Sequence, residues 1–261
     1  MIPCLIFFVL HWQLSVFSQS FFLHRYAAHK QFSMSKGWER FFHLLTWITQ
    51  GSSYLSPRAY SILHRMHHAY SDTPKDPHSP IQQSNLFRMM WETKILYSGL
   101  RKKTLEPEKR FEGGYPEWKL IDGPLSSWPM SLVWGTLYTL FYLHFATSPW
   151  LYLLLPLHYM MGPIHGAIVN WCGHKYGYRN FDCDDASRNT LIFDFVTAGE
   201  LFQNNHHAHA MSPNFAARAF EVDPTYTVIR LLAWLHIIEI KGGRVRWKKS
   251  TRPSSSLPLE P

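Results

Sequence analysis

Charged residues are absent from two long stretches of the chain, and both stretches are rich in apolar side chains. No Lys, Arg, Asp or Glu occurs within residues 1–23 or 126–172. An uncharged apolar run of about 20 residues is long enough to cross a bilayer as a helix. The second run is about twice that length, and Thr147, Ser148 and Pro149 lie near its middle. The pattern therefore predicts one span followed by a helical hairpin, with arms over 129–147 and 149–169.

The segments between these runs are mixed in polarity. Residues 41–64 are apolar in part, but Gln50 to Ser53 and Pro57 interrupt them. This pattern favours a helix along the membrane interface over one that crosses. Residues 72–83 are rich in Pro and polar side chains, which predicts a loop.

These elements predict an all-α integral membrane protein with about three transmembrane helices. An interfacial helix and a cytoplasmic helical cap, formed by the mixed segments 88–119 and 173–241, complete the predicted fold. We expect one membrane-embedded domain over residues 1–247. Residues 248–261, where three serines are flanked by prolines, are predicted to be a disordered tail.

Composition and charge agree with a membrane protein. The chain of 261 residues is 46% hydrophobic and 16% aromatic, with a formal net charge of +8. All 26 Lys and Arg fall within residues 25–119 and 175–252, on either side of the predicted hairpin. Three spans place both basic blocks on the cytoplasmic side of, we expect, a bacterial inner membrane, with the N-terminus outside. The basic residues are spread out and accompany no recognition motif, so nucleic acid is not an expected partner.

Cysteine spacing and the N-terminal segment limit the compartment. Cys4, Cys172 and Cys183 show no paired spacing, which indicates a reducing compartment without disulfides. The first apolar run resembles a signal peptide in position, but it lacks a basic start and leads directly into a histidine motif, so we interpret it as a retained span. Tryptophans near the predicted span ends are expected to be interfacial anchors: Trp128, Trp134 and Trp150.

The 16 histidines of the chain carry the candidate chemistry. Four short motifs each follow a predicted membrane segment or lie on the same predicted side: "HRYAAH" (His24, His29), "HRMHH" (His64, His67, His68), "NWCGH" (Asn170, His174) and "QNNHH" (Gln203, His206, His207). Imidazoles this close repel one another when protonated, so we expect a metal to take up their lone pairs. Eight imidazoles exceed the needs of one tetrahedral zinc ion, which predicts two metal ions. Iron, zinc, copper and nickel all suit nitrogen ligands, and spacing does not choose among them. Isolated histidines are expected to be surface or interfacial imidazoles: His11, His43, His144 and His236.

The order of these motifs resembles that of the membrane fatty acid desaturases, in particular the stearoyl-CoA (delta-9) type in a bacterial-like form. The patterns of that family are HxxxxH, HxxHH, NxxxH and HxxHH, and "HRMHHAYSDTPKDPH" and "HKYGYRNF" extend the likeness from Phe21 to about Glu239.

The resemblance implies a di-iron enzyme that uses O₂ to remove two hydrogens from an acyl chain and so introduces a cis double bond. It implies that the eight histidines of the four motifs are iron ligands and that Asn170 orients a metal-bound water. Asp76 and His78 are expected near the ligands or in a turn. Glu200 is expected either to hydrogen-bond a ligand imidazole or to cap a helix.

The chain departs from the pattern of this family at three places. Gln203 occupies the place of the first histidine of the last box. Gln203 either ligates a metal through its amide oxygen, or holds a metal-bound water, or is polar filler. His209 is disfavoured as a replacement for the missing histidine, because its spacing breaks the pattern. Ile62 and Leu63 stand where animal acyl-CoA enzymes carry an Arg-Asp pair, which favours an acyl-lipid over an acyl-CoA substrate. One span precedes the first motif where the family usually has two.

No His-Pro-Gly-Gly motif occurs in the sequence, so we expect electrons from a separate donor of the ferredoxin or cytochrome b5 type. Two basic clusters are candidate docking sites for this donor or for anionic lipid: Arg101, Lys102 and Lys103, and Arg244, Arg246, Lys248 and Lys249.

Two rival functions remain open at this point. A di-iron lipid hydroxylase would use the same histidine framework and give an alcohol in place of an alkene. A non-catalytic membrane metal-binding or transport protein would need ionisable groups within the spans. The predicted spans offer only histidines for that purpose: His11, His144, His158 and His165.

Overall fold

The computed structural model describes residues 1–192 and 194–243, and these residues are mostly helical. The helices, in chain order, are α1 (Ile2–Ser18), η1 (Gln19–Ala28), α2 (Lys36–Gln50), η2 (Gly51–Ser53), α3 (Pro57–Tyr70), α4 (Leu86–Lys102), η3 (Lys109–Phe111), α5 (Lys119–Asp122), η4 (Pro124–Ser126), α6 (Trp128–Phe145), η5 (Pro149–Leu154), α7 (Leu155–Tyr159), α8 (Met161–Lys175), α9 (Gln203–Ala208) and α10 (Pro224–Trp234). The predicted tail, 248–261, and the second predicted basic cluster lie outside the described residues.

A small antiparallel sheet corrects the expectation of an all-α fold. β1 (Phe32–Met34) pairs with β2 (Ile238–Ile240), and Phe32 lies opposite Ile240. Phe32 and Ile238 are buried in an apolar cluster with Phe21 and Phe22. The pair therefore fixes the end of the described chain beside the segment that follows η1.

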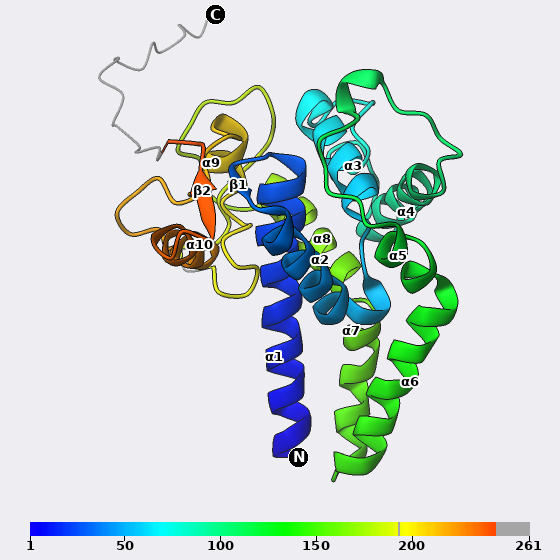
Figure 1. The fold of residues 1–261 in the computed structure, drawn as a ribbon. Helices are drawn as coiled ribbons and strands as arrows, with labels where there is room; N and C mark the ends of the chain where they lie inside the picture. The colour runs from blue at the N-terminus through cyan, green and yellow to red at the C-terminus, as the bar shows by residue number, and fades with distance from the viewer. Residues whose placement is uncertain (193, 244–261) are drawn as a thin grey trace, which may run out of the picture.

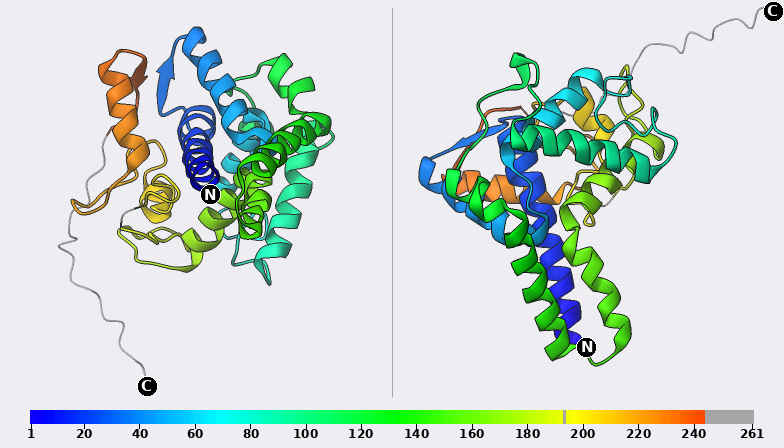
Figure 2. Two further views of the ribbon diagram at one scale, coloured as in Figure 1. Left: turned by 90° about the horizontal axis from the view of Figure 1, so that it is seen from below. Right: turned by 90° about the vertical axis from the view of Figure 1, so that its right-hand side faces the viewer.

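A stalk of three helical arms extends from a wider part that holds the remaining elements (Figures 1 and 2). The arms are α1, α6 and the segment from η5 through α7 into α8, and the N-terminus lies at the narrow end. Many apolar side chains of α1 and α6 are exposed, among them Leu10 (56%) and Leu143 (61%). Such a surface suits a hydrocarbon environment.

By length and composition, one helix among the described residues could cross a membrane, namely Ile2–Ala28, which joins α1 to η1. The predicted number of three spans therefore stays a prediction. The first arm of the predicted hairpin forms α6, close to its expected bounds.

The second arm of the hairpin is not the continuous helix that we predicted. It consists of a 3-10 turn, η5, followed by α7 and α8, with Met160 in a non-helical conformation between the last two. Pro156 and Pro163 lie near the beginnings of α7 and α8. Proline lacks the N–H that an interior helical position must donate, so each proline marks the start of a new helix.

The predicted interfacial segment consists of α2 and the beginning of α3, separated at η2 where the polar residues interrupt the pattern. α2 is amphipathic: Phe42 and Thr46 are buried, whereas Phe41, Leu44 and Ile48 are exposed. The loop predicted at residues 72–83 lies between α3 and α4 without helix or strand.

Candidate metal centre

A π-helix presents the first two histidines on one side of the chain. η1 continues α1, and the His29 amide donates to the His24 carbonyl over 3.1 Å, five residues back. In an α-helix, residues five apart point about 140° away from each other. The wider turn of a π-helix brings them close to alignment, and the two imidazole centroids are 5.0 Å apart.

The second motif lies on α3, which packs against η1. Pro57 and Ser56 begin this helix, and near its end His67 and His68 follow His64 by about one turn. His64 and His68 face the first motif: the His29 and His64 Nε2 atoms are 2.7 Å apart, and the His29 and His68 centroids are 4.7 Å apart. His67 points toward the later motifs, with its ring 5.0 Å from that of His174.

The last two motifs complete the cluster from the other side. His174 lies near the end of α8, and His206 and His207 are consecutive on the short helix α9. Because consecutive helical residues point in different directions, His206 and His207 join different neighbours. His206 Nε2 lies 2.9 Å from His68 Nε2, whereas the His207 ring lies 4.9 Å from that of His174.

All eight predicted histidines thus meet in two adjacent groups. Within each group the candidate ligand atoms lie within 4.8 Å of one another. The five-histidine group comprises His24, His29, His64, His68 and His206, and the three-histidine group comprises His67, His174 and His207. Their role as metal ligands remains a prediction, but the arrangement brings together the predicted set.

Carboxylates hold the rear nitrogen, Nδ1, of four of these rings. Asp76 accepts from His67 at 2.9 Å, Asp72 pairs with His174 at 2.9 Å, Asp185 pairs with His207 at 2.6 Å, and Glu200 pairs with His24. A carboxylate in this position fixes the tautomer and leaves Nε2 as a lone-pair donor. Among the described residues, the Nε2 atoms of His67, His174 and His207 are buried and have no hydrogen-bond partner. Buried nitrogens without a partner are rare, so this donor set fits a metal ion.

The sequence indicated two of these carboxylates and missed the other two. Asp76 and Glu200 were expected near the site, and each contacts a ring nitrogen. Asp72 and Asp185 were not expected. Only their positions in the sequence could have indicated them. Asp72 follows the second motif by four residues, and Asp185 lies in the acidic run "DCDD" before the last motif.

The electrostatics of the site favour neutral imidazoles and ionised carboxylates at Asp72, Asp185 and Glu200, whereas burial raises the pKa of Asp76. Burial, with the neighbouring rings, lowers the pKa of His64, His67, His68 and His206 well below the usual value. Burial acts to raise the pKa of Glu200. The charge and the hydrogen bond of His24, together with the charge of Arg25, outweigh burial and lower this pKa to about 2. The pKa of Asp72 and that of Asp185 are also lowered, because their histidine partners outweigh burial. Metal binding requires these protonation states.

The remaining predicted site residues lie near the groups without completing them. Gln203 is buried, and its amide nitrogen donates to the Glu200 carbonyl at 2.6 Å. It packs so closely on Gly173 that a Cβ there would lie 2.4 Å from the Gln203 Cγ. Asn170 donates to the Gly166 carbonyl of its own helix at 2.8 Å. Their roles at a metal remain predictions.

Two further histidines outside the two groups were also considered in the sequence. His78 is buried, and its ring lies 4.4 Å from that of His67. With His67 and Asp76 it forms another cluster of potential ligand atoms. His209 packs on Phe181 and belongs to neither histidine group.

Of the isolated histidines, two are buried rather than at the surface, which corrects their prediction. His11 in α1 contacts His158 in α7, with their Nδ1 atoms 2.7 Å apart, and His158 also contacts the Tyr142 hydroxyl at 2.9 Å. His43 contacts the Tyr54 hydroxyl at 2.8 Å. His144 and His236 are exposed as predicted.

Fold and site together define a class of protein: a helical chain with an apolar arm and a histidine-rich candidate metal centre at the base of that arm. Comparison with known proteins places it within that class. Residues 1–226 match the family model described as fatty acid desaturase. The chain belongs to the fatty acid desaturase family, and the desaturases among its relatives indicate an oxidoreductase.

Three relatives illustrate the range of this family. The chain is 30% identical over 225 residues to an sn-1 stearoyl-lipid 9-desaturase of Synechocystis, covering 81% of this chain and 63% of the relative. It is 28% identical to an acyl-CoA 5-desaturase of Anemone leveillei (84% and 65% covered). It is 26% identical to a hex-5-enoyl-[acyl-carrier protein] acetylenase of Moorena producens (84% and 70% covered). The chain thus spans about two thirds of the length of these relatives.

Proposed function

We propose that this protein is an oxygen-dependent fatty acyl desaturase that introduces a cis double bond with a histidine-ligated di-iron centre. The observation that carries the proposal is the convergence of eight buried or half-buried histidines in two adjacent groups, with four rings held from behind by carboxylates. One metal ion in each group would use the Nε2 atoms that face away from those carboxylates.

Bound iron would supply the oxidising power that amino-acid side chains lack for breaking an unactivated C–H bond. Per double bond, the acyl chain loses two hydrogens, and O₂, two electrons and two further protons account for the two waters formed. The residues of this chain orient the imidazoles and exclude water, since His24, His67 and His206 are themselves almost fully buried.

The acyl carrier that we favour is a membrane lipid. Ile62 and Leu63, the positions that carry an Arg-Asp pair in animal acyl-CoA enzymes, are buried in α3 at 0% and 8% exposure. Apolar side chains in such a place offer a coenzyme no polar contact. One relative is named a stearoyl-lipid desaturase, whereas others are named acyl-CoA desaturases, so the carrier is a point for experiment.

The proposed setting is a bacterial inner membrane, with the metal centre on the cytoplasmic side. The three stalk arms would span the bilayer. Exposed Trp128, at the start of α6, and exposed Trp150, in η5 after the end of α6, would lie near the two interfaces. Trp134 is half-buried against Trp47 and fits this anchoring role less well. A separate electron donor would dock on the basic surface that includes the exposed residues Arg101 to Lys103.

The test is the fatty-acid profile of a host that expresses the protein, with iron determined on the purified protein. The native protein should yield new monounsaturated chains and contain two irons. The His206→Ala variant should abolish the product and lower the iron content, whereas His236→Ala, which changes an exposed histidine outside both groups, should alter neither. Hydroxylated acyl chains as the product would identify the protein as a hydroxylase in place of a desaturase. A purified protein that binds zinc or no metal would refute the di-iron proposal.

A Gln203→His variant tests the role of residue 203, where the chain differs from the histidine pattern of the family. A change in iron content or in the iron spectrum would place residue 203 at the metal, and an unchanged spectrum would make Gln203 a packing residue against Gly173.

A further inference from the structure

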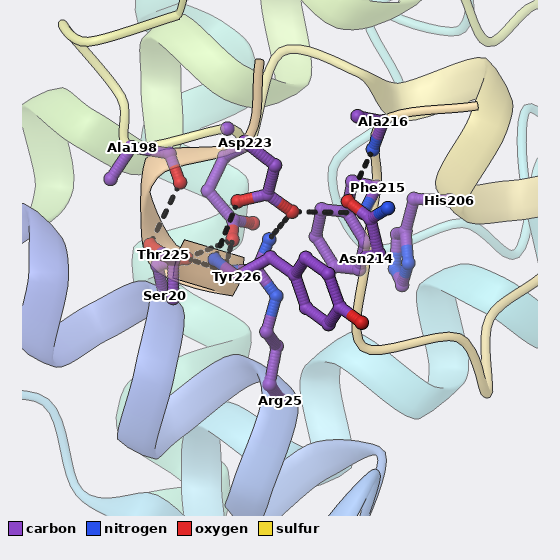
Figure 3. A network of polar contacts seen from close by, with 12 residues as sticks. Ser20, Arg25, Ala198, His206, Asn214, Phe215, Ala216, Asp223, Thr225 and Tyr226 are labelled. Atoms are coloured by element: carbon purple, nitrogen blue, oxygen red, sulfur yellow. Dashed lines mark hydrogen bonds and ion pairs between the residues drawn. The ribbon is translucent and has the colours of Figure 1, made fainter. Parts of the chain in front are cut away.

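Arg25, the residue after His24, is a completely buried guanidinium with two carboxylate partners, Glu200 and Asp223, and Figure 3 shows it beside Asp223. Its Nη2 donates to Asp223 Oδ2 at 2.8 Å. Its Nη1 donates to the Ser20 hydroxyl and lies 3.5 Å from Glu200 Oε1. Burying a charge is unfavourable unless it is paired with good geometry, so this arrangement fixes the positions of both acids.

The first partner, Glu200, connects Arg25 to a candidate metal ligand. Glu200 Oε1 accepts from the Ser20 hydroxyl at 2.5 Å, while Oε2 pairs with His24 Nδ1. Arg25 and Ser20 therefore hold one oxygen of the carboxylate, and the other oxygen sets the rotation of the His24 ring. A carboxylate that orients a metal-binding histidine is most effective when it is itself held.

The second partner, Asp223, connects Arg25 to the segment that follows the last histidine motif. Asp223 Oδ2 also accepts from the Phe215 amide at 2.8 Å, and Oδ1 accepts from the Tyr226 amide at 3.0 Å, which caps α10. The guanidinium carbon lies 3.8 Å from the centroid of the Phe215 ring. On the metal side, that ring lies 4.3 Å from the centroid of His206 and 5.4 Å from that of His24.

We propose that Arg25 is a positioning residue for the five-histidine group, which acts through Glu200 on His24 and through Phe215 on His206. The proposal rests on the proposed metal centre. Its distinctive consequence is selectivity: Arg25 contacts the surroundings of two ligands of the five-histidine group, whereas the carboxylates of the three-histidine group are Asp76, Asp72 and Asp185. Loss of Arg25 therefore disturbs one metal position and spares the other.

The experiment uses the full-length protein purified in detergent and loaded anaerobically with ⁵⁷Fe(II). Mössbauer spectra and the rate of iron release to excess ferrozine are measured for the native protein, Arg25→Lys, Arg25→Met and Phe215→Leu. Lysine keeps the charge but lacks the planar fork that meets two acids at once. The matched control is Arg88→Met, since Arg88 is 63% exposed and pairs with Glu92 on the outside of α4. Asp185→Asn serves as the reciprocal variant.

We expect one of two iron signals to change in each Arg25 variant and in Phe215→Leu, with release of about one iron at least tenfold faster than in the native protein. Asp185→Asn should affect the other signal, and Arg88→Met neither. Native spectra and release rates in Arg25→Lys and Phe215→Leu would overturn the proposal, as would equal loss of both irons. If Arg25→Met fails to fold by circular dichroism, the other two variants decide. A native protein that binds no iron would instead refute the proposed function.

Discussion

The Asp185 carboxylate holds His207 from behind, so its removal should weaken metal binding without removing a ligand. Asp185→Asn keeps the shape of the side chain and loses its charge, and we expect metal affinity to fall by about 10- to 100-fold. Competition with a chelator of known affinity measures this change. Asp184→Asn is the matched control, because Asp184 is the neighbouring acid and is exposed. Equal affinities for the two variants would contradict the role of Asp185.

Arg65, between two histidines of the second motif, ties the first motif to the rest of the site. Its Nε and Nη2 donate to the carbonyls of Ala28 and Ala27 at 3.0 Å, at the end of η1. Its Nη1 donates to the carbonyls of Phe111 and Gly113 at 3.0 and 2.8 Å. Four carbonyls thus depend on one guanidinium.

We expect Arg65→Ala to destabilise the protein by about 2–4 kcal/mol, because carbonyls that lose a partner each cost about 1–3 kcal/mol unless water replaces it. Arg65→Lys should recover only part of this, since an ammonium does not reproduce the fork. Thermal unfolding in detergent measures the change, and an unaltered midpoint for Arg65→Ala would show that water replaces all four hydrogen bonds.

At this scale the sequence indicated which histidines come together, but it gave little information about the carboxylates that hold them. The eight histidines stand in spaced motifs, and a histidine cluster without a metal is unfavourable, so the pattern itself carries the inference. Asp72 and Asp185 carry no such pattern, because an acid in a loop looks the same whether or not it faces a ring nitrogen. Only the folded chain brings Asp185 to a residue 22 positions away.

Among the elements, η1 makes the most specific demand on the chain. This π-helix of ten residues sets His24 and His29 side by side. Their spacing of five would not do so in an α-helix. Insertion of one alanine after Ala27 would place the two histidines six residues apart, which turns them about 120° from each other in an α-helix, and would rotate one histidine away from the other.

We therefore expect this insertion to lose iron from the five-histidine group while the overall helix content stays nearly constant. Ala27→Gly keeps the number of residues and should retain both irons. Metal analysis with circular dichroism distinguishes the two variants, and full iron retention after the insertion would contradict the requirement for a spacing of five residues in η1.

The elements also show which parts of the fold a hydrophobic pattern can predict. The pattern placed α6 well, because an uninterrupted apolar run between a polar start and a turn has few alternative structures. It failed for the second arm, where apolarity is continuous but Pro156 and Pro163 divide the hydrogen bonding. It also gave no sign of η1, since α- and π-helix have nearly the same preference for apolar residues.

For the molecule as a whole, the histidine cluster predicts that the metal-free protein loses stability in acid. Burial lowers the pKa of these imidazoles in the folded state, whereas an unfolded histidine titrates near 6.5. Below about pH 6.5 the unfolded chain therefore binds more protons than the folded one, and the free energy of unfolding decreases as the pH falls.

We expect the thermal midpoint of the metal-free protein to be nearly constant from pH 8 to 7 and to fall progressively from about pH 6.5 to 5. Asp72, Asp185 and Glu200 add a further loss only below about pH 4, where unfolded carboxyl groups take up protons. Unfolding scans at each pH measure the profile. A midpoint that is flat down to pH 5 would show that the buried imidazoles accept protons without cost.

The separation of the histidines along the chain has a consequence for biosynthesis. His24 and His206 lie 182 positions apart, yet their Nε2 atoms are 3.0 Å from each other. During translation the arm that bears His24 emerges and can enter the membrane long before the ribosome has made His206. At a rate of about 5–20 residues per second, that interval lasts on the order of ten seconds or more. A growing chain therefore holds an incomplete histidine set through most of its synthesis. We expect the metal to bind tightly only after the last motif has been made.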